Sequence, residues 1–308
     1  MRVIVTGGCG FIGSSFVHLL YEQGGFDILV VDKLTYAGNK DNIPADVPLL
    51  VKDICDVTAE DLGEFEYLVN FAAETHVDNS IEDGRPFVRT NVEGTFNLLE
   101  IARKNPFLEK FVQISTDEVY GDLYYLKVDK STETDDLKPS SYYSATKAAA
   151  DLLVQSTVKT YSNPFALKWL ITRTCNNFGV RQHEEKMIPK IIKCIKEGKE
   201  IPVYGDGQQQ REWIWVEDNV QIIYQLMLSF ATGIYNIGSG DVLTNMELIP
   251  KMKFPNYPRP RVEFVEDRKG HDRRYALDTT KLKQSIGNKL PRNKSVITYI
   301  FEQLREDK

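Results

Sequence analysis

Two adjacent carboxylates, Asp117 and Glu118, are the residues whose position most strongly suggests chemistry. They lie in the segment 115–121, directly after an apolar run at 111–114 that is typical of a buried strand. Charges at such a position are costly, because they leave water and repel each other. Neighbours on a regular strand point to opposite faces, so both can serve one pocket only if the backbone already turns there. Such a pair can act as acid and base on one substrate, whereas the alternative is a polar exit from the strand.

Tyr143 and Lys147 form a second reactive pair, because a spacing of four residues places both on one face of a helix. Turn-forming and capping residues at 139–142 precede that helix. A lysine ammonium near a phenol favours the phenolate and lowers the pKa of the tyrosine. A tyrosine tuned in this way can take a proton from a substrate hydroxyl. Taken alone, the spacing would also suit a pair of surface side chains.

A glycine-rich segment at the start of the chain predicts a dinucleotide site. Gly7, Gly10 and Gly13 follow the first apolar strand and open the first helix. They allow a tight turn, close approach of the backbone to a pyrophosphate and close helix–sheet packing. Asp32 lies 19 residues after Gly13, where a carboxylate would bind the ribose hydroxyls and favour NAD over NADP. The neighbouring Lys33 leaves NADP open, and a glycine turn kept only for packing is the other alternative.

The ends of two further strands are expected to border the same cofactor. Asp53 and Ile54 follow the third strand, and Phe71, Ala72 and Ala73 end the fourth. In doubly wound folds, ligands bind at the carboxyl ends of the strands. These residues are therefore candidate cofactor contacts, with ordinary strand ends as the alternative.

The elements that position these residues alternate between strand and helix in the first half of the chain. The predicted strands are 2–6, 28–32, 49–53, 67–73, 111–115 and 167–174, and the predicted helices are 11–22, 85–104 and 144–161. Continuously apolar strands suit a parallel sheet that is covered on both faces. We therefore predict an α/β fold with a Rossmann-like, doubly wound parallel sheet.

The second half has a different character, since turn-forming clusters become frequent after about residue 174. Short helices are expected at 187–197, 217–230 and 295–305. We predict an NAD-binding domain at 1–174 and a smaller mixed α/β C-terminal substrate-binding domain at 175–308. The boundary between them is soft, because the chain can cross back to the sheet.

Composition narrows the class of protein. The chain has 308 residues, of which 42% are hydrophobic and 27% are charged, as in globular domains. The net charge of −6 argues against a nucleic-acid-binding surface, and no run approaches the ~20 apolar residues of a membrane span. The first residues lack the layout of a signal peptide. The four cysteines show no paired spacing and the four histidines no metal-ligand spacing, so we expect a cytoplasmic protein with reduced thiols and no metal site.

Together these motifs resemble the extended short-chain dehydrogenase/reductase family, and within it the nucleotide-sugar 4,6-dehydratases. The resemblance covers residues 1 to about 280. It rests on the glycine segment, on Thr116-Asp117-Glu118 and on the Tyr143/Lys147 pair. Further matching runs are His76-Val77-Asp78, Asn176-Asn177, Glu185-Lys186-Met187-Ile188-Pro189, Arg211-Glu212-Trp213 and Gly270-His271-Asp272-Arg273-Arg274-Tyr275.

The resemblance implies a reaction that uses both carboxylates. NAD would oxidise a hexose at C4, with Tyr143 as the base and Thr116 positioning the hydroxyl. Glu118 would then remove the C5 proton while Asp117 protonates the departing C6 hydroxyl. Hydride would return to C6, so that the net reaction is the loss of water, a hydro-lyase reaction. The implied substrate is dTDP-glucose or a related nucleotide-diphosphate hexose.

The resemblance also implies binding residues, and guanidinium groups such as that of Arg211 suit phosphate oxygens. The implied cofactor contacts are Gly7, Gly10, Phe11, Ile12, Gly13, Asp32, Lys33, Leu34, Thr35, Asp53, Ile54, Phe71, Ala72, Ala73, Thr75, Thr90, Tyr143, Lys147 and Asn177. The implied substrate contacts are Thr75, Asp78, Thr116, Asn176, Lys186, Met187, Pro202, Val203, Tyr204, Arg211, Asn245, Arg268 and His271. A homodimer formed through helices 85–104 and 143–161 is implied as well.

Other functions stay open at this point. An NAD-dependent nucleotide-sugar 4-epimerase or decarboxylase of the same fold would need Tyr143 and Lys147 but not the carboxylate pair, and a non-catalytic NAD-binding sensor would need none of them. The chain departs from the family pattern at Tyr142, where proline is usual, and at Thr174-Cys175. The segment 245–261 is short and rich in proline. Because that region helps to select the nucleotide base, dTDP, UDP, CDP and GDP all remain candidates.

Overall fold

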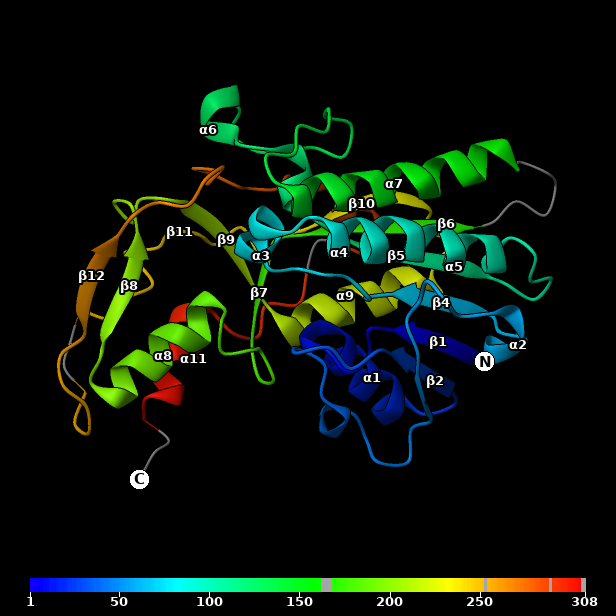
Figure 1. Ribbon diagram of the computed structural model, residues 1–308, viewed down its shortest axis with the longest axis horizontal. Helices are drawn as coiled ribbons and strands as arrows, with labels where there is room; N and C mark the ends of the chain where they lie inside the picture. Colours follow the sequence, from blue (N-terminus) through cyan, green and yellow to red (C-terminus); the bar gives the residue numbers. More distant parts are fainter. Residues whose placement is uncertain (162–167, 252–253, 288–289, 306–308) are drawn as a thin grey trace.

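A seven-stranded parallel sheet forms the centre of the protein in the computed structural model, which describes residues 1–161, 168–251, 254–287 and 290–305 (Figure 1). Its order is β10-β6-β5-β4-β1-β2-β3. The strands are β1 (Arg2–Thr6), β2 (Asp27–Asp32), β3 (Leu49–Val51), β4 (Tyr67–Asn70), β5 (Lys110–Thr116), β6 (Trp169–Thr174) and β10 (Gly233–Ile237). The order reverses between β1 and β4, which is where doubly wound folds bind dinucleotides. The prediction of a Rossmann-like fold is confirmed; Leu167 of the strand predicted at 167–174 lies outside the described residues.

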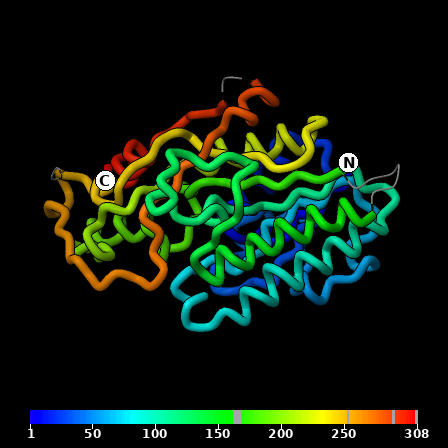
Figure 2. The backbone as a smooth tube through the Cα atoms, turned by 90° about the horizontal axis from the view of Figure 1, so that it is seen from above, coloured from blue at the N-terminus to red at the C-terminus, as the bar shows by residue number. Residues whose placement is uncertain are grey.

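Helices cover both faces of this sheet, which explains why its strands are continuously apolar. Val3 and Val5 belong to one hydrophobic core and Ile4 to another, as the period of two in a strand requires. The helices α1 (Phe11–Gln23) and α9 (Val216–Leu228) cover the first core, and α5 (Thr95–Ala102) and α7 (Tyr142–Thr160) cover the second (Figure 1). Figure 2 shows α5 and α7 side by side.

The strands end at different points from those that the sequence predicts. β3 and β4 stop at Val51 and Asn70, before the predicted ends at residues 53 and 73. The chain leaves the sheet early there, and its next residues line a cavity. β5 extends to Thr116 and turns directly into the 3₁₀ helix η3 (Asp117–Tyr120). The predicted turn at the two carboxylates is therefore present.

The helix predicted at 85–104 is interrupted by an unusual segment. The structure has α4 (Arg85–Phe87), then the π-helical stretch η2 (Val88–Gly94), and then α5. A π-helix is wider than an α-helix, and such segments occur frequently at functional sites. Hydrophobic periodicity did not reveal this change.

The second half of the chain builds a smaller unit at the carboxyl end of the large sheet (Figure 1). Its strands form two small sheets, β11-β9-β7 and β12-β8. Their bounds are β7 (Asn176–Phe178), β8 (Glu200–Tyr204), β9 (Gln210–Trp215), β11 (Val242–Thr244) and β12 (Arg261–Val265). The helices α8 (Met187–Glu197) and α11 (Val296–Gln303) pack on a third hydrophobic core. β10 and α9 also come from this half but belong to the large layer, so the chain crosses back.

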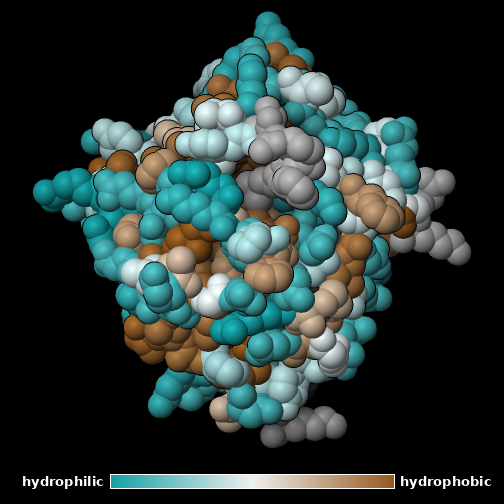
Figure 3. Space-filling view, turned by 90° about the vertical axis from the view of Figure 1, so that its right-hand side faces the viewer, coloured by the Kyte–Doolittle hydropathy of each residue, from teal (hydrophilic) through white to brown (hydrophobic). Residues whose placement is uncertain are grey.

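The remaining helical elements are short. They are η1 (Lys40–Asn42), α2 (Ala59–Leu62), α3 (Val77–Glu82), α6 (Leu123–Leu126) and α10 (Thr280–Ile286). On the face drawn in Figure 3, apolar patches alternate with larger polar areas. Within the described part of the chain, no helix combines the length and apolar character needed to cross a membrane.

Candidate active site

The glycine turn between β1 and α1 is built for close approach. Gly7 has a φ of 67°, and a Cβ added there would lie 2.6 Å from the backbone nitrogen of Ala72. A Cβ on Gly13 would overlap the carbonyl group of Gly7. The turn therefore packs directly against the exit of β4, and the N-terminus of α1 faces the cavity beside it. This geometry fits a pyrophosphate at the helix N-terminus.

The end of β2 carries the groups that select the ribose. Asp32 is buried and accepts backbone hydrogen bonds from Cys9 at 3.0 Å and Leu34 at 2.8 Å. Burial raises the pKa of Asp32 above its ordinary value. The ammonium of Lys33 lies 3.2 Å from a carboxylate oxygen of Glu74 and 3.8 Å from one of Asp53. Because two carboxylates compensate its charge, Lys33 is a poor partner for a 2′-phosphate, and the site fits NAD.

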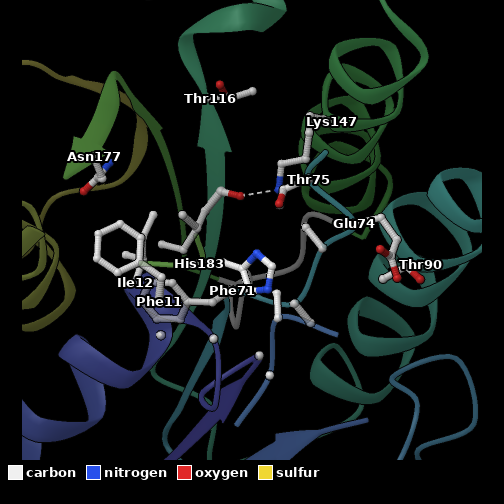
Figure 4. A pocket seen from close by; sticks show the side chains of 18 of the residues that line it. Phe11, Ile12, Phe71, Glu74, Thr75, Thr90, Thr116, Lys147, Asn177 and His183 are labelled. Atoms are coloured by element: carbon white, nitrogen blue, oxygen red, sulfur yellow. Dashed lines mark hydrogen bonds between the residues drawn. The ribbon is translucent and has the colours of Figure 1, made fainter. Parts of the chain in front are cut away.

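A cavity of about 310 Å³ joins these groups (Figure 4). Among the predicted cofactor residues, its lining contains Gly7, Gly10, Phe11, Ile12, Gly13, Asp32, Lys33, Thr35, Ile54, Phe71, Ala72, Ala73, Thr75, Thr90 and Asn177. Leu34 and Asp53 lie beside these residues rather than in the lining. The same cavity is lined by all five predicted reacting residues, which are Thr116, Asp117, Glu118, Tyr143 and Lys147. One continuous space therefore connects the dinucleotide turn with the two reactive pairs.

Helix α7 presents Tyr143 and Lys147 to this cavity. Ser141 caps the helix, and its hydroxyl accepts a hydrogen bond from the backbone of Ser144. The ammonium of Lys147 donates to the carbonyl oxygen of Ile114 at 2.5 Å, and burial lowers its pKa to about 8.

The phenol of Tyr143 behaves differently from the prediction made from its spacing. Burial and the negative charge of Glu118 raise its pKa, and a hydrogen bond with Thr116 opposes the rise only in part. Lys147 points to the backbone of β5 instead of compensating the phenolate, so desolvation decides the pKa of this tyrosine in the structure.

The two neighbouring carboxylates differ in the charges around them. Burial, with the negative charges of Glu118 and Glu212, raises the pKa of Asp117 well above its ordinary value. Burial also raises the pKa of Glu118, but there the positive charges of Arg268 and Arg211 oppose the rise. Asp117 is thus the better proton donor and Glu118 the better proton acceptor. Separation of this kind identifies acid and base roles.

Cations from the smaller unit face these carboxylates. Arg211 on β9 is buried, its guanidinium donates to the carbonyl oxygens of Gln210 and Asp272 at 2.8 Å each, and it stacks 4.3 Å from the ring centroid of Tyr275. Lys186, before α8, donates to the carbonyl oxygen of Thr75 at 3.3 Å. Backbone and aromatic groups therefore fix the direction of each cation.

The other predicted substrate residues divide into two groups. Asn176 lines the cavity with Thr75, Thr116 and Lys186, whereas Asp78, Met187, Pro202, Val203, Tyr204, Arg211, Asn245, Arg268 and His271 lie outside its lining. Among these, Asp78 on α3 accepts a hydrogen bond from the hydroxyl of Tyr204 at 3.2 Å and lies 3.9 Å from Arg268. Val203 is a buried core residue of β8.

His271 and Asn245 have hydrogen-bond partners within the smaller unit. His271 contacts Asp267 at 2.6 Å, and burial lowers its pKa to about 4, so the imidazole is neutral at neutral pH. Asn245 is buried, and its amide donates to the side chain of Gln209 at 3.5 Å.

Sequence reasoning missed several residues that lie in the lining of the cavity or next to it. Tyr36, after β2, donates to Glu185 at 3.2 Å, and its ring lies edge-on to His183 with centroids 5.3 Å apart. Glu74, Gln182 and Cys175 line the cavity, together with His183 and Glu185. Glu185 and Cys175 stand within matched or noted runs, so their position in the sequence was a usable signal. Nothing in the sequence indicated the contact between Tyr36 and Glu185.

Fold and site together define a dinucleotide-dependent enzyme of the extended short-chain dehydrogenase/reductase class. The model of the NAD dependent epimerase/dehydratase family matches residues 3–238, and the chain belongs to this family. The predictions of the family, of NAD as the cofactor and of a dehydratase-type hydro-lyase are confirmed.

The chain is also similar to individual proteins and solved structures of this family. The chain is 48% identical to the low-salt glycan biosynthesis protein Agl12 of Haloferax volcanii, over 92% of each chain. It is 42% identical to a dTDP-glucose 4,6-dehydratase of Streptomyces griseus, over 93% of this chain and 88% of the relative. The structure of DesIV, a dTDP-glucose 4,6-dehydratase from Streptomyces venezuelae with NAD and TYD bound, has a TM-score of 0.89 and 37% identity, covering 100% of this chain and 98% of that one.

Proposed function

We propose that this protein is a nucleotide-sugar 4,6-dehydratase that converts dTDP-glucose, or a related nucleotide-diphosphate hexose, to the 4-keto-6-deoxy sugar nucleotide and water. One observation carries the proposal above all. Asp117 and Glu118 lie side by side in the cavity that Tyr143 and Lys147 line; burial raises the pKa of both, and more cations oppose the rise at Glu118 than at Asp117. Water elimination needs one acid and one base on the same substrate, and this site offers both.

The first step requires a base at the C4 hydroxyl. Tyr143 and Thr116 line the cavity together, and we assign this proton to Tyr143 and the positioning of the sugar to Thr116. Because burial raises the pKa of Tyr143, the role requires that the positive charge of a bound cofactor offset this rise. NAD, when bound, supplies the oxidant for C4 and later the reductant for C6. Lys147, whose pKa is lowered to about 8, retains its charge at neutral pH and can hold a ribose hydroxyl.

The elimination step uses the carboxylates. The ketone at C4 acidifies the C5 proton, and Glu118 accepts it because Arg268 and Arg211 favour its ionised form. Asp117 donates its proton to the C6 hydroxyl, which leaves as water, because burial and its carboxylate neighbours keep it protonated. The C5–H and C6–O bonds break, and a C5–C6 double bond forms between them. Reduction of this double bond would add hydride at C6 and a proton at C5, which Glu118 would return after exchange with solvent.

The smaller unit supplies the contacts for the nucleotide diphosphate. Arg211 and Arg268 offer planar donors for phosphate oxygens, and Lys186 adds a third positive charge near Glu118. Asp78 on α3 lies beside Arg268 and accepts a hydrogen bond from Tyr204 on β8, whose ring lies near that of His271 after β12. We propose that residues 1–174 bind the cofactor and 175–308 the substrate, with β10 and α9 crossing back to the first layer.

Turnover on a panel of dTDP-, UDP-, CDP- and GDP-hexoses tests the proposal. The expected result is loss of one water from one of these substrates, seen by mass spectrometry, with dTDP-glucose as the preferred substrate. A protein that binds NAD but dehydrates none of them would contradict the proposal. Configuration change at C4 without loss of mass would instead support a 4-epimerase, and loss of carbon dioxide from a uronic acid a decarboxylase.

Two further observations support proposals about the oligomeric state and the location of the protein. Val88, Phe96 and Leu152 are exposed on η2, α5 and α7, which lie on one side of the sheet (Figure 2). We propose that two copies pair through these helices to form a homodimer. We also propose a cytoplasmic location, which suits the four free cysteines. Light scattering of the purified protein tests the dimer, and a monomeric mass at micromolar concentration would contradict it.

A further inference from the structure

The segment 270–275, which follows β12 in the smaller unit, carries a buried carboxylate outside the two reactive pairs. Asp272 is 6% exposed. One of its carboxylate oxygens accepts hydrogen bonds from the hydroxyls of Ser140 and Tyr275. Burial raises the pKa of Tyr275 well above its ordinary value, so its hydroxyl stays protonated and donates. Because Ser140 comes from the first half of the chain, the carboxylate of Asp272 links the two halves.

On the cofactor side, this link reaches the start of helix α7. Ser140 directly precedes Ser141, the residue that caps α7, and Tyr143 lies in the first turn of that helix. Gly270 has a φ of 65°, and a Cβ added there would lie 3.0 Å from the carbonyl oxygen of Ser140. The two segments therefore pack backbone against backbone. Asp272 thus holds the end of α7 that carries the proposed base for the C4 hydroxyl.

On the substrate side, the same segment holds a cation proposed to bind phosphate. The guanidinium of Arg211 donates to the carbonyl oxygen of Asp272 at 2.8 Å and stacks on the ring of Tyr275. The backbone nitrogen of Gln210 donates to the carbonyl oxygen of Arg273 at 2.8 Å, and that of Tyr275 to Gln210 at 3.2 Å. The segment therefore runs along the start of β9, and the position of Arg211 is fixed relative to Asp272.

A second contact fastens this segment to the element that carries the two carboxylates. Asp122 follows η3, and its carboxylate accepts hydrogen bonds from the backbone nitrogens of Arg273 at 2.6 Å and Arg274 at 3.1 Å. The negative charge of Asp272 is one cause of the raised pKa of Glu118, so the segment also lies near the proposed C5 base. The segment 270–275 therefore joins η3, α7 and β9.

We infer that Asp272 is a positioning residue, which sets the distance between Arg211 and Tyr143 by binding Ser140. The inference rests on the proposed function, in which Arg211 holds the substrate diphosphate and Tyr143 takes the C4 proton. The diphosphate is then held by one half of the chain while the sugar reacts at the other, so a shift between the halves misplaces the sugar without weakening either anchor. A misplacement of ~1 Å between reacting groups costs about a hundredfold in rate, so the effect belongs to turnover.

Two variants remove the link from opposite ends. Ser140→Ala deletes the donor at an exposed residue, where the fold should tolerate it, and Asp272→Asn removes the charge and keeps the shape. We expect each to lower kcat by about tenfold or more, with KM within about threefold of the wild-type value. Ser140→Thr retains a hydroxyl and should keep kcat near the wild-type value. Because both residues act through one bond, the double variant should lose no more than the worse single variant.

Binding of the two ligands taken singly separates a positioning role from damage to either half. Calorimetry with NAD, and with the nucleoside diphosphate whose hexose the wild-type protein turns over fastest, should give wild-type affinities for Ser140→Ala. Wild-type kcat in Ser140→Ala, losses that multiply in the double variant, or a loss of affinity for either ligand that accounts for the loss of turnover would overturn the inference.

Ser156→Ala is the matched control. Ser156 lies near the other end of α7, and its hydroxyl donates to the carbonyl oxygen of Leu153 within the same helix at 3.0 Å. The variant removes the same atom from the same helix, so it should leave kcat unchanged even if it lowers stability. An equal loss of kcat in Ser156→Ala and Ser140→Ala would show that any weakening of α7 lowers turnover, and would refute a specific role for the link.

Hydrogen–deuterium exchange on the NAD-loaded protein supplies a readout without substrate. Ser140→Ala should speed exchange at 140–145 and at 271–275, and Ser156→Ala should not. Unchanged exchange in both segments would contradict the link by itself. If the wild-type protein dehydrates no nucleotide sugar, the proposed function fails, while the exchange result still decides whether Asp272 holds the start of α7.

Discussion

The two halves of the molecule bring their functional groups together in different ways. The cofactor half uses the backbone at strand ends, where Gly7 and Gly13 approach neighbouring main chain so closely that a side chain has no room. The substrate half uses single side chains from separate segments, such as Arg211 on β9 and Lys186 before α8, each oriented by backbone carbonyl groups. The carboxylates stand where the halves meet. We therefore expect substitutions in the cofactor half to weaken NAD binding strongly, and substitutions in the substrate half to weaken substrate binding by smaller amounts.

Substitution of the two carboxylates, which lie where the halves meet, should have the largest effect on turnover. Glu118→Gln removes the proposed base and Asp117→Asn the proposed acid, and general acid–base groups contribute about 10²–10⁴-fold to rate. We expect kcat for dehydration to fall within this range in each variant, while NAD and substrate still bind. Steady-state kinetics checks the loss and calorimetry checks binding. A double variant that turned over like the wild type would mean that the carboxylates are only a polar strand exit.

The second-largest effect is expected for a glycine substitution in the cofactor half, measured as a loss of NAD affinity. An added methyl group in Gly13→Ala would overlap the carbonyl of Gly7, whereas in Gly10→Ala it would lie 3.3 Å from the same oxygen. Hydrogen bonds to charged groups contribute ~1.5–3 kcal/mol. We therefore expect Gly13→Ala to weaken NAD binding by about tenfold to a hundredfold, and Gly10→Ala by much less. Titration of apoprotein with NAD measures both, and equal affinities would break the proposed contrast between the halves.

The substrate half should show a graded response. Arg211→Lys keeps the charge but loses the planar fork and the stacking on Tyr275. We expect KM for the nucleotide sugar to rise by about tenfold, with NAD affinity unchanged. An unchanged KM would show that Arg211 does not contribute to substrate binding.

The pH profile should show the smallest effect, and its sign follows from the shifted groups. The pKa of Lys147 is lowered to about 8, so its positive charge is present below that pH and is lost above it. The pKa of Glu118 is raised, so the base becomes protonated, and turnover falls, at a higher pH than for an ordinary glutamate. We expect kcat to decline above about pH 8 and to recover on return to neutral pH. A flat profile from pH 7 to well above 8 would exclude Lys147 as the titrating group.

The same contrast explains how much the sequence could predict. The glycine turn, Asp32 and the Tyr143/Lys147 pair are short local patterns, and each falls on the predicted kind of element. The π-helical stretch was missed because hydrophobic periodicity contains no information on tertiary contacts such as that of Asn91 with Thr146 on α7. The contact of Tyr36 with Glu185 joins residues 149 positions apart, so spacing could not reveal it. The prediction that the pKa of Tyr143 is lowered was wrong, because burial raises this pKa and outweighs the effect of the nearby lysine.

The central claim is that this site removes the C5 proton and expels the C6 hydroxyl as water. Turnover of the preferred nucleotide hexose in heavy water tests it most directly, with the product examined by mass spectrometry and NMR. We predict a product that has lost one water and carries solvent deuterium at C5, formed by the wild-type protein and not by Glu118→Gln. A product of unchanged composition, or dehydration without deuterium at C5, would contradict the account.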